Sequence, residues 1–150
     1  MAEQLHRCGL DEVQVQPLGV DLEAFQPQRA KPNARRALGI SEDQHLLVFA
    51  GRGTQEKNIP VLFGLVALEG MASGLPVVCV DAGALPEVVP GDCGRHVRPN
   101  DGAAMAGGVR DLFEHDDPAA LGRRARAHVE TRHSWDAVAE SLVGHYRRVL

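Results

Sequence analysis

The chain of 150 residues has few cysteines, and their spacing excludes the common uses of clustered thiols. Cys8, Cys79 and Cys93 are odd in number and form no Cys-x-x-Cys pair. This pattern argues against a disulfide framework and against a thiolate metal site. Cys79 is most simply a buried strand residue.

The sequence also lacks a long apolar run and an excess of positive charge. Its longest weakly polar stretch, residues 59–80, is broken by Glu69, Ser73 and Pro76, and residues 1–10 contain no apolar signal core. We therefore expect no membrane span, no secretory signal and a cytoplasmic location. The net charge of −4 gives no reason to expect nucleic acid as a partner.

What the chain does contain is the composition of one soluble globular domain, with 44% hydrophobic and 24% charged residues. A domain of this length can bury about 68–70% of the surface that its unfolded chain exposes. A substantial hydrophobic core is therefore possible.

A helix followed by a buried strand is predicted in the middle of the chain. Apolar residues recur at helical spacing from Ile59 to Ala72, so we expect one helix there. Gly74 adopts the left-handed conformation of a helix end without strain, and Pro76 prevents continuation. Residues 76–80 then form a β-branched run that ends at Asp81, which is typical of a strand buried in a parallel sheet.

Further elements are predicted on both sides of this unit. The run HLLVFA at residues 45–50 indicates a buried strand, and residues 94–99 indicate a short edge strand. Helical segments are predicted at residues 86–89, 101–115, 118–132 and 134–150. This order predicts an α/β fold, a reduced Rossmann-like three-layer sandwich with a mainly parallel sheet.

A candidate anion site lies in the polar loop before the central helix. Arg52 and Lys57 are five residues apart there, next to a helix amino terminus whose unpaired N–H groups favour a diphosphate. Two solvated surface charges are the alternative interpretation. Gly51-x-Gly53 also fits the start of a dinucleotide-binding pattern, although Glu56 stands where the third glycine belongs.

Three segments in combination point to one enzyme family: GRGTQEKN at 51–58, FGLVALEGMASGLPVV at 63–78 and DAGALPE at 81–87. They resemble the carboxyl-terminal, donor-binding domain of the family 4 glycosyltransferases, which have the two-domain GT-B fold. The resemblance reaches both ends of the chain. Residues 13–25 are similar to the segment that leads from the amino-terminal domain, and residues 134–146 to the closing helix.

The resemblance implies a nucleotide-sugar donor as partner and retaining hexosyl transfer as reaction. Gly51, Arg52 and Lys57 would hold the donor diphosphate, and the two cations would be catalytic, because negative charge grows on the diphosphate as the glycosidic bond breaks. Glu69 would bind the ribose. Backbone N–H groups would approach the sugar and phosphates at Phe63, Gly64, Leu65 and Val66. The family uses no metal here and the seven histidines form no ligand cluster, so we expect no metal and no cofactor.

Departures from the family pattern predict a shortened protein. The family has two glutamates separated by seven residues, but Val61 stands eight positions before Glu69. About three βαβ units and the whole amino-terminal domain are also missing by comparison with the family. We therefore expect a single shortened domain, with residues 1–32 as a former interdomain segment, 44–132 as the Rossmann-like core and 134–150 as the closing helix.

Our first hypothesis for function is glycosyl transfer, with the activity impaired in this chain. A non-catalytic diphosphate-binding or interaction module and an NAD-binding module are the alternatives. If Ile59 to Ala72 is one helix, Lys57 lies just before its amino terminus and Glu69 lies about 15 Å along the axis from Ile59, so Glu69 cannot reach the ribose of a ligand held at Lys57. The Arg-rich tail is interpreted as a solvated helix face, so no stable membrane binding is expected. The oligomeric state is not predicted.

Overall fold

The computed structural model describes residue 7, residues 16–48 and residues 59–149, with the backbone alone for residues 59–63 and 149. Its elements in chain order are η1 (Pro27–Arg29), α2 (Ala34–Ala37), α3 (Ile59–Ala72), β1 (Val77–Val80), α4 (Leu85–Val88), β2 (Gly94–Val97), α5 (Gly102–Glu114), α6 (Pro118–Arg132) and α7 (Trp135–Val149). Among the described helices, none has the length and apolar character needed to cross a membrane.

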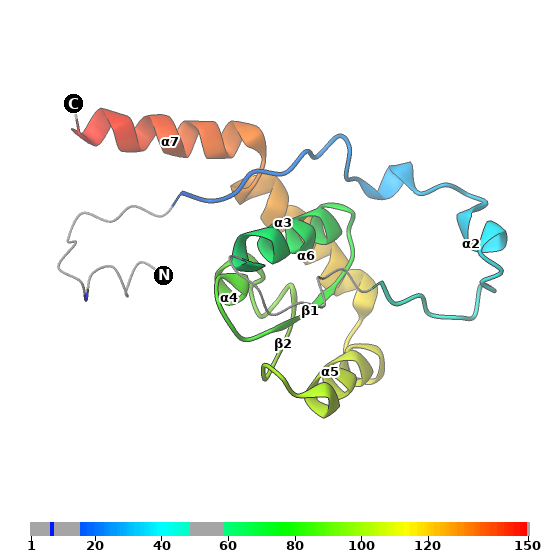
Figure 1. Ribbon diagram of the computed structural model, residues 1–150. Coiled ribbons are helices and arrows are strands. Elements are labelled where there is room, and N and C mark those ends of the chain that lie inside the picture. Colours follow the sequence, from blue (N-terminus) through cyan, green and yellow to red (C-terminus); the bar gives the residue numbers. More distant parts are fainter. Residues whose placement is uncertain (1–6, 8–15, 49–58, 150) are drawn as a thin grey trace.

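Two short parallel strands, β1 and β2, form the central layer (Figure 1). Side chains alternate between the two faces of a strand, so Val77 faces α3 while Val78 and Val97 face α5. The packing agrees, because a Cβ built on Gly70 in α3 would lie 3.8 Å from Val77, and one on Gly108 in α5 would lie 2.7 Å from Val97. Helices therefore cover both faces, and the predicted three-layer α/β fold with a small parallel sheet is confirmed.

Side-chain caps explain where the long carboxyl-terminal helices begin. The Asp101 carboxylate accepts a hydrogen bond from Ala104 N at 2.8 Å, and Asp117 accepts bonds from two amides at the start of α6. The Ser134 hydroxyl accepts a bond from Ala137 N at 3.2 Å at the start of α7. Such caps satisfy amide groups that the helix itself leaves unpaired. The helices predicted at 101–115, 118–132 and 134–150 are confirmed as α5, α6 and α7, the last of them over its described residues.

The turn after α3 closes as its glycine predicts. Gly74 has a φ of 75°, and its N–H bonds to Met71 O at 2.9 Å while Leu75 N bonds to Gly70 O at 3.0 Å. This pair of bonds is a Schellman motif, which ends a helix and reverses the chain. The strand predicted at residues 76–80 follows as β1, so the helix-to-strand unit is confirmed.

The core lies between α3, α6 and the sheet. Leu68 and Met71 from α3 are fully buried in one cluster with Ala125 and Val129 from α6. Cys79 on β1 joins this core, as predicted. Burial is the main reason that the pKa of its thiol is raised to about 11, and the nearby Asp81 charge adds to the effect. The thiol is therefore protonated and inert near neutral pH.

The strand predicted at HLLVFA is wrong for the part that the structure describes. Residues 45–48 are not a strand, and Leu46, Leu47 and Val48 are 50%, 63% and 78% exposed. Phe49 and Ala50 lie outside the described residues. An apolar run becomes a buried strand only if another strand accepts its backbone hydrogen bonds. In the described part of the chain, β1 and β2 pair with each other and not with this segment.

The segment before η1 is fastened to the junction of α6 and α7. Val20 N donates to His133 O at 2.8 Å, and the His133 ring bonds Leu18 O through Nδ1 at 2.9 Å. Val20 itself is 2% exposed and belongs to the core. The early segment is thus held by residues more than a hundred positions later, which local sequence patterns do not reveal.

Acidification should destabilise this junction through His128. Burial, and then the nearby His133 and Arg132 charges, lower the pKa of His128 below its usual 6.5, with a smaller opposing effect of Asp92. Below pH 6.5 the His128 ring therefore binds a proton more readily in the unfolded chain than in the folded chain. The contribution of His128 to the free energy of unfolding is present above pH 6.5 and is lost as the pH falls. Urea unfolding at pH 7.5 and 5.5 measures the loss.

The His128→Gln variant should show a smaller drop in unfolding free energy between the two pH values than the wild type. His115→Gln is the control, because His115 is an exposed histidine that contacts only Asp111 at 3.9 Å among the described ion pairs. An unchanged pH dependence in His128→Gln would contradict the assignment.

Candidate functional site

The amino terminus of α3 lies at the sheet edge where parallel strands end. The short Schellman turn makes α3 and β1 run in opposite directions, so the start of α3 lies near the end of β1. A Cβ built on Gly64, in the second turn of α3, would accordingly lie 3.6 Å from Val88 of α4, which follows β1. This edge is where open α/β sheets commonly bind ligands.

Within α3, the first turn holds the amide groups that the helix itself does not pair. An α-helix pairs none of its first four N–H groups internally, and Pro60 has none, so the donors without an acceptor inside α3 are those of Ile59, Val61 and Leu62. The predicted donor amides of residues 63–66 (Phe63, Gly64, Leu65 and Val66) lie one turn further on, where i→i−4 geometry pairs them inside the helix. Their predicted role in donor binding would require this turn to open.

Glu69 lies near the opposite end of α3. Its backbone carbonyl accepts the Ser73 hydroxyl at 2.9 Å, and the next residue, Gly70, packs against Val77 at the start of β1. The helix is continuous from Ile59 to Ala72, as predicted, which puts Glu69 about 15 Å along the axis from the first turn. None of the described ion pairs includes the half-buried Glu69 side chain.

The remaining predicted donor-binding residues, Gly51, Arg52 and Lys57, lie outside the described residues. Their roles, including the catalytic roles of the two cations, stay predictions. The carboxyl end of β1 is described: Asp81 is exposed, its N–H bonds to Val97 O at 2.8 Å, and Gly83 turns the chain away with a φ of 63°.

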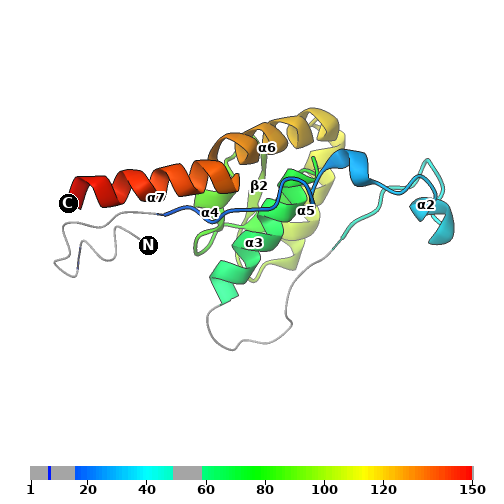
Figure 2. The ribbon, with the colours of Figure 1, turned by 90° about the horizontal axis from the view of Figure 1, so that it is seen from above.

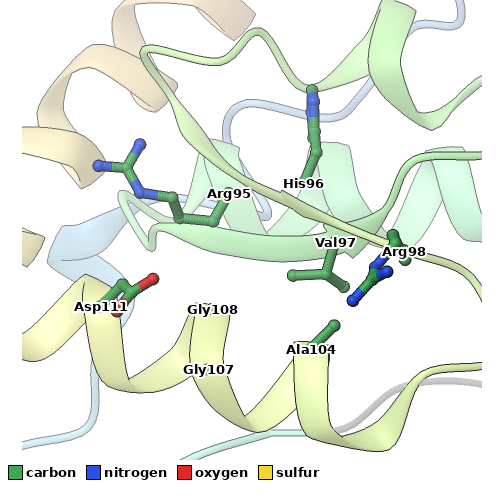
Figure 3. Close-up of a pocket in the computed structure, with 8 residues that line it drawn as sticks. All are labelled: Arg95, His96, Val97, Arg98, Ala104, Gly107, Gly108 and Asp111. Atoms are coloured by element: carbon green, nitrogen blue, oxygen red, sulfur yellow. The ribbon is translucent and has the colours of Figure 1, made fainter.

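A groove of about 360 Å³ lies between β2 and α5 (Figure 3). Its walls are Arg95, His96, Val97, Arg98, Ala104, Gly107, Gly108 and Asp111. Sequence reasoning missed this groove, because it depends on how closely α5 approaches the strand. The two adjacent glycines of α5 are the local signal that could have indicated it.

The groove does not have the chemistry of a diphosphate site. Arg95 forms an ion pair with Asp116, and Arg98 lies 3.2 Å from the Asp101 carboxylate. A diphosphate would have to compete with carboxylates for both guanidinium groups. Nor do three His, Cys, Asp or Glu side chains gather as a metal site would need, within the described ranges.

Comparison with known proteins identifies the family. A model of the group 1 glycosyl transferases matches residues 42–115, about half of the chain. A glycogen synthase of Mycobacterium tuberculosis is 42% identical over 88 residues, which is 56% of this chain and 21% of that protein. A D-inositol 3-phosphate glycosyltransferase of Acidothermus cellulolyticus is 42% identical over 89 residues, 59% of this chain and 20% of the relative.

Two further matches cover more of the chain. The MMP alpha-(1→4)-mannosyltransferase of Mycolicibacterium hassiacum is 37% identical over 120 residues, 75% of this chain and 28% of that protein. The structure of sucrose-phosphate synthase from Thermosynechococcus elongatus aligns with a TM-score of 0.76 at 20% identity, covering 99% of this chain and 56% of that one. At this identity the structural match shows the fold alone.

The chain spans between a fifth and just over a quarter of the length of these curated relatives. The matches agree on one family, and the chain belongs to the group 1 glycosyltransferases.

Proposed function

We propose that this chain is a donor-binding part of a glycosyltransferase that moves a hexosyl group from a nucleotide sugar with retention. The observation that supports the proposal is the family match over residues 42–115, which includes an α3 whose amino terminus faces the ligand-binding edge of the sheet. All the relatives named above are transferases or synthases of sugars by name.

The chemistry proposed for this edge is stabilisation of a departing diphosphate. The amides of Ile59, Val61 and Leu62, which have no acceptor inside α3, and the positive end of the α3 dipole attract anions. Arg52 and Lys57 precede these amides in the chain and would add two cations. As the glycosidic bond of a donor breaks, charge that appears on the diphosphate is met by these fixed donors.

The length of α3 favours a more limited function for the chain alone. A diphosphate at the first turn leaves Glu69 about 15 Å away along the helix, too far for the same nucleotide's ribose. We therefore infer that the isolated chain binds a nucleoside diphosphate weakly and transfers no sugar. This is the non-catalytic binding module, and it is our second candidate function.

Calorimetry with UDP, ADP and GDP, combined with a sugar-transfer assay, tests both functions. We expect a dissociation constant on the order of 1 mM and no transfer. Lys57→Ala should weaken binding by about tenfold, roughly 1.4 kcal/mol, while Lys31→Ala, the same change at an exposed residue of another segment, should have no effect. Equal effects of the two variants would contradict a site at α3.

Glu69→Ala should leave nucleotide affinity unchanged, because the carboxylate lies at the far end of α3. The same calorimetric titration measures this. A tenfold loss of affinity in Glu69→Ala, about 1.4 kcal/mol, would show that Glu69 does reach the ligand and that the separation we infer is wrong.

Saturable binding of NADH, detected by its fluorescence, would instead support the dinucleotide alternative. The cytoplasmic location stays a prediction.

A further inference from the structure

Strand β2 has an open edge beside the groove that it forms with α5. It pairs with β1 on one side, and no strand of the described chain lies on its other side (Figure 2). Asp81 N donates to Val97 O at 2.8 Å, so the backbone groups of Val97 turn toward β1. Backbone groups of successive strand residues point in alternate directions, so those of His96 turn to the open edge. Among the hydrogen bonds of the described residues, none uses the His96 N–H or C=O.

The groove has room for side chains next to this edge. Gly108 brings α5 close to the strand, since a Cβ there would lie 2.7 Å from Val97. One residue earlier the helix leaves space, because a Cβ on Gly107 would meet no atom within 4 Å. Val97 points toward α5, while His96 points away from it and its ring bonds Val89 O at 2.7 Å (Figure 3). A strand added to the edge would therefore place alternate side chains in the groove.

The two ends of the groove carry opposite charges (Figure 3). Arg98, at the end near the start of α5, is 84% exposed. Its Nη2 lies 3.2 Å from Asp101, and a guanidinium group has five N–H donors, so others remain for a ligand. Asp111, at the other end, is 57% exposed, and among the described ion pairs it contacts a histidine, His115 at 3.9 Å, and no lysine or arginine.

We propose that the β2–α5 groove binds an extended peptide of another polypeptide, which adds to β2 as an antiparallel strand. Strand addition to an open edge is a common mode of peptide recognition, in which backbone hydrogen bonds give affinity and side-chain contacts give selectivity. A second copy of β2 is a poor occupant, because it would gather the arginines at positions 95 and 98 of both chains along one edge.

The register predicts which peptide fits. The residue opposite His96 exchanges two backbone hydrogen bonds with it. The preceding residue lies opposite Val97 with its side chain in the groove, so an apolar residue suits it. The residue before that lies opposite Arg98, where an acid is favoured. The residue after the central one lies at the Asp111 end, where a base is favoured. The predicted pattern is therefore acidic, apolar, any residue, basic, as in Glu-Val-Thr-Lys.

Fluorescence anisotropy with the full chain and a labelled Ser-Glu-Val-Thr-Lys-Ser peptide tests the proposal. We expect saturable binding with a dissociation constant on the order of 100 μM. The peptide in which Glu and Lys are exchanged has the same composition and should bind at least about tenfold more weakly. Absence of saturable binding overturns the proposal, and equal or tighter binding of the exchanged peptide overturns the antiparallel arrangement.

Filling the groove should block the peptide. Gly107→Leu should weaken binding at least about tenfold, and leucine is the better helix former, so α5 is retained. Gly144→Leu is the matched control in α7, where a Cβ also meets no atom within 4 Å, and should leave the affinity unchanged. Wild-type affinity in Gly107→Leu overturns the proposal.

Charge reversal at Asp111 tests the selectivity. Asp111→Arg should weaken binding of the Glu-Val-Thr-Lys peptide about tenfold and should prefer a Glu-Val-Thr-Glu peptide instead. Glu140→Arg, which changes the net charge equally on α7, should do neither. An unchanged preference in Asp111→Arg contradicts the predicted register. UDP should not displace the peptide, because α3 and α5 cover opposite faces of the sheet, and displacement by UDP would overturn a separate peptide site.

Discussion

Gly122→Ala is expected to destabilise the fold by about 3 kcal/mol, although alanine is the better helix former. A Cβ on Gly122 in α6 would lie 2.0 Å from the carbonyl oxygen of Gly74 in the turn after α3. Gly74 has little room to retreat, because its other side faces Pro27 and its own φ is 75°. The added methyl group must therefore push α6 away from α3, and so open the core. Urea unfolding measures the loss.

Gly107→Ala is the matched control for this prediction. Gly107 also lies inside a helix, but a Cβ there would meet no atom within 4 Å. Helix propensity then acts alone, and we expect a gain of roughly 1 kcal/mol. If Gly122→Ala were neutral or stabilising like the control, the close approach of α6 to the turn after α3 would be contradicted.

Arg126→Ala is expected to cost about 2–3 kcal/mol of unfolding free energy, because one guanidinium group joins segments that are distant in sequence. Its Nη1 donates to Phe25 O at 2.6 Å and also to Ala72 O, the last residue of α3, while Nε donates to Glu130 at 2.6 Å. The side chain is only 19% exposed, so loss of the arginine leaves partly buried carbonyl groups unpaired. Thermal and urea unfolding both measure the effect.

Arg123→Ala provides the comparison on the same helix. Arg123 is 71% exposed and lies 3.8 Å from Asp117, a surface ion pair of the kind that contributes less than about 1 kcal/mol. A similar loss in the two variants would mean that Arg126 acts through the net charge of α6 and not through the carbonyl groups of Phe25 and Ala72.

Short-range patterns predicted most of the helices because their causes are local. Apolar spacing and the Gly74 turn determine α3, and the Asp101, Asp117 and Ser134 caps determine the starts of α5, α6 and α7. The groove beside α5 is different, since its volume depends on the distance between a helix and a strand. The family resemblance came from segments of sequence and did not require the fold.

By itself the sequence determined the helices, the β1 strand, the family and the identity of the candidate donor residues. Periodicity, caps and motifs depend on residues that are close together in the sequence. Tertiary structure alone decided that Leu46, Leu47 and Val48 are exposed, because a strand needs hydrogen-bond partners that no local pattern supplies. It also decided that Leu142, Val143 and Tyr146 of α7 are exposed. Each of these depends on which elements meet in space, and packing between distant segments is the physical interaction that selects them.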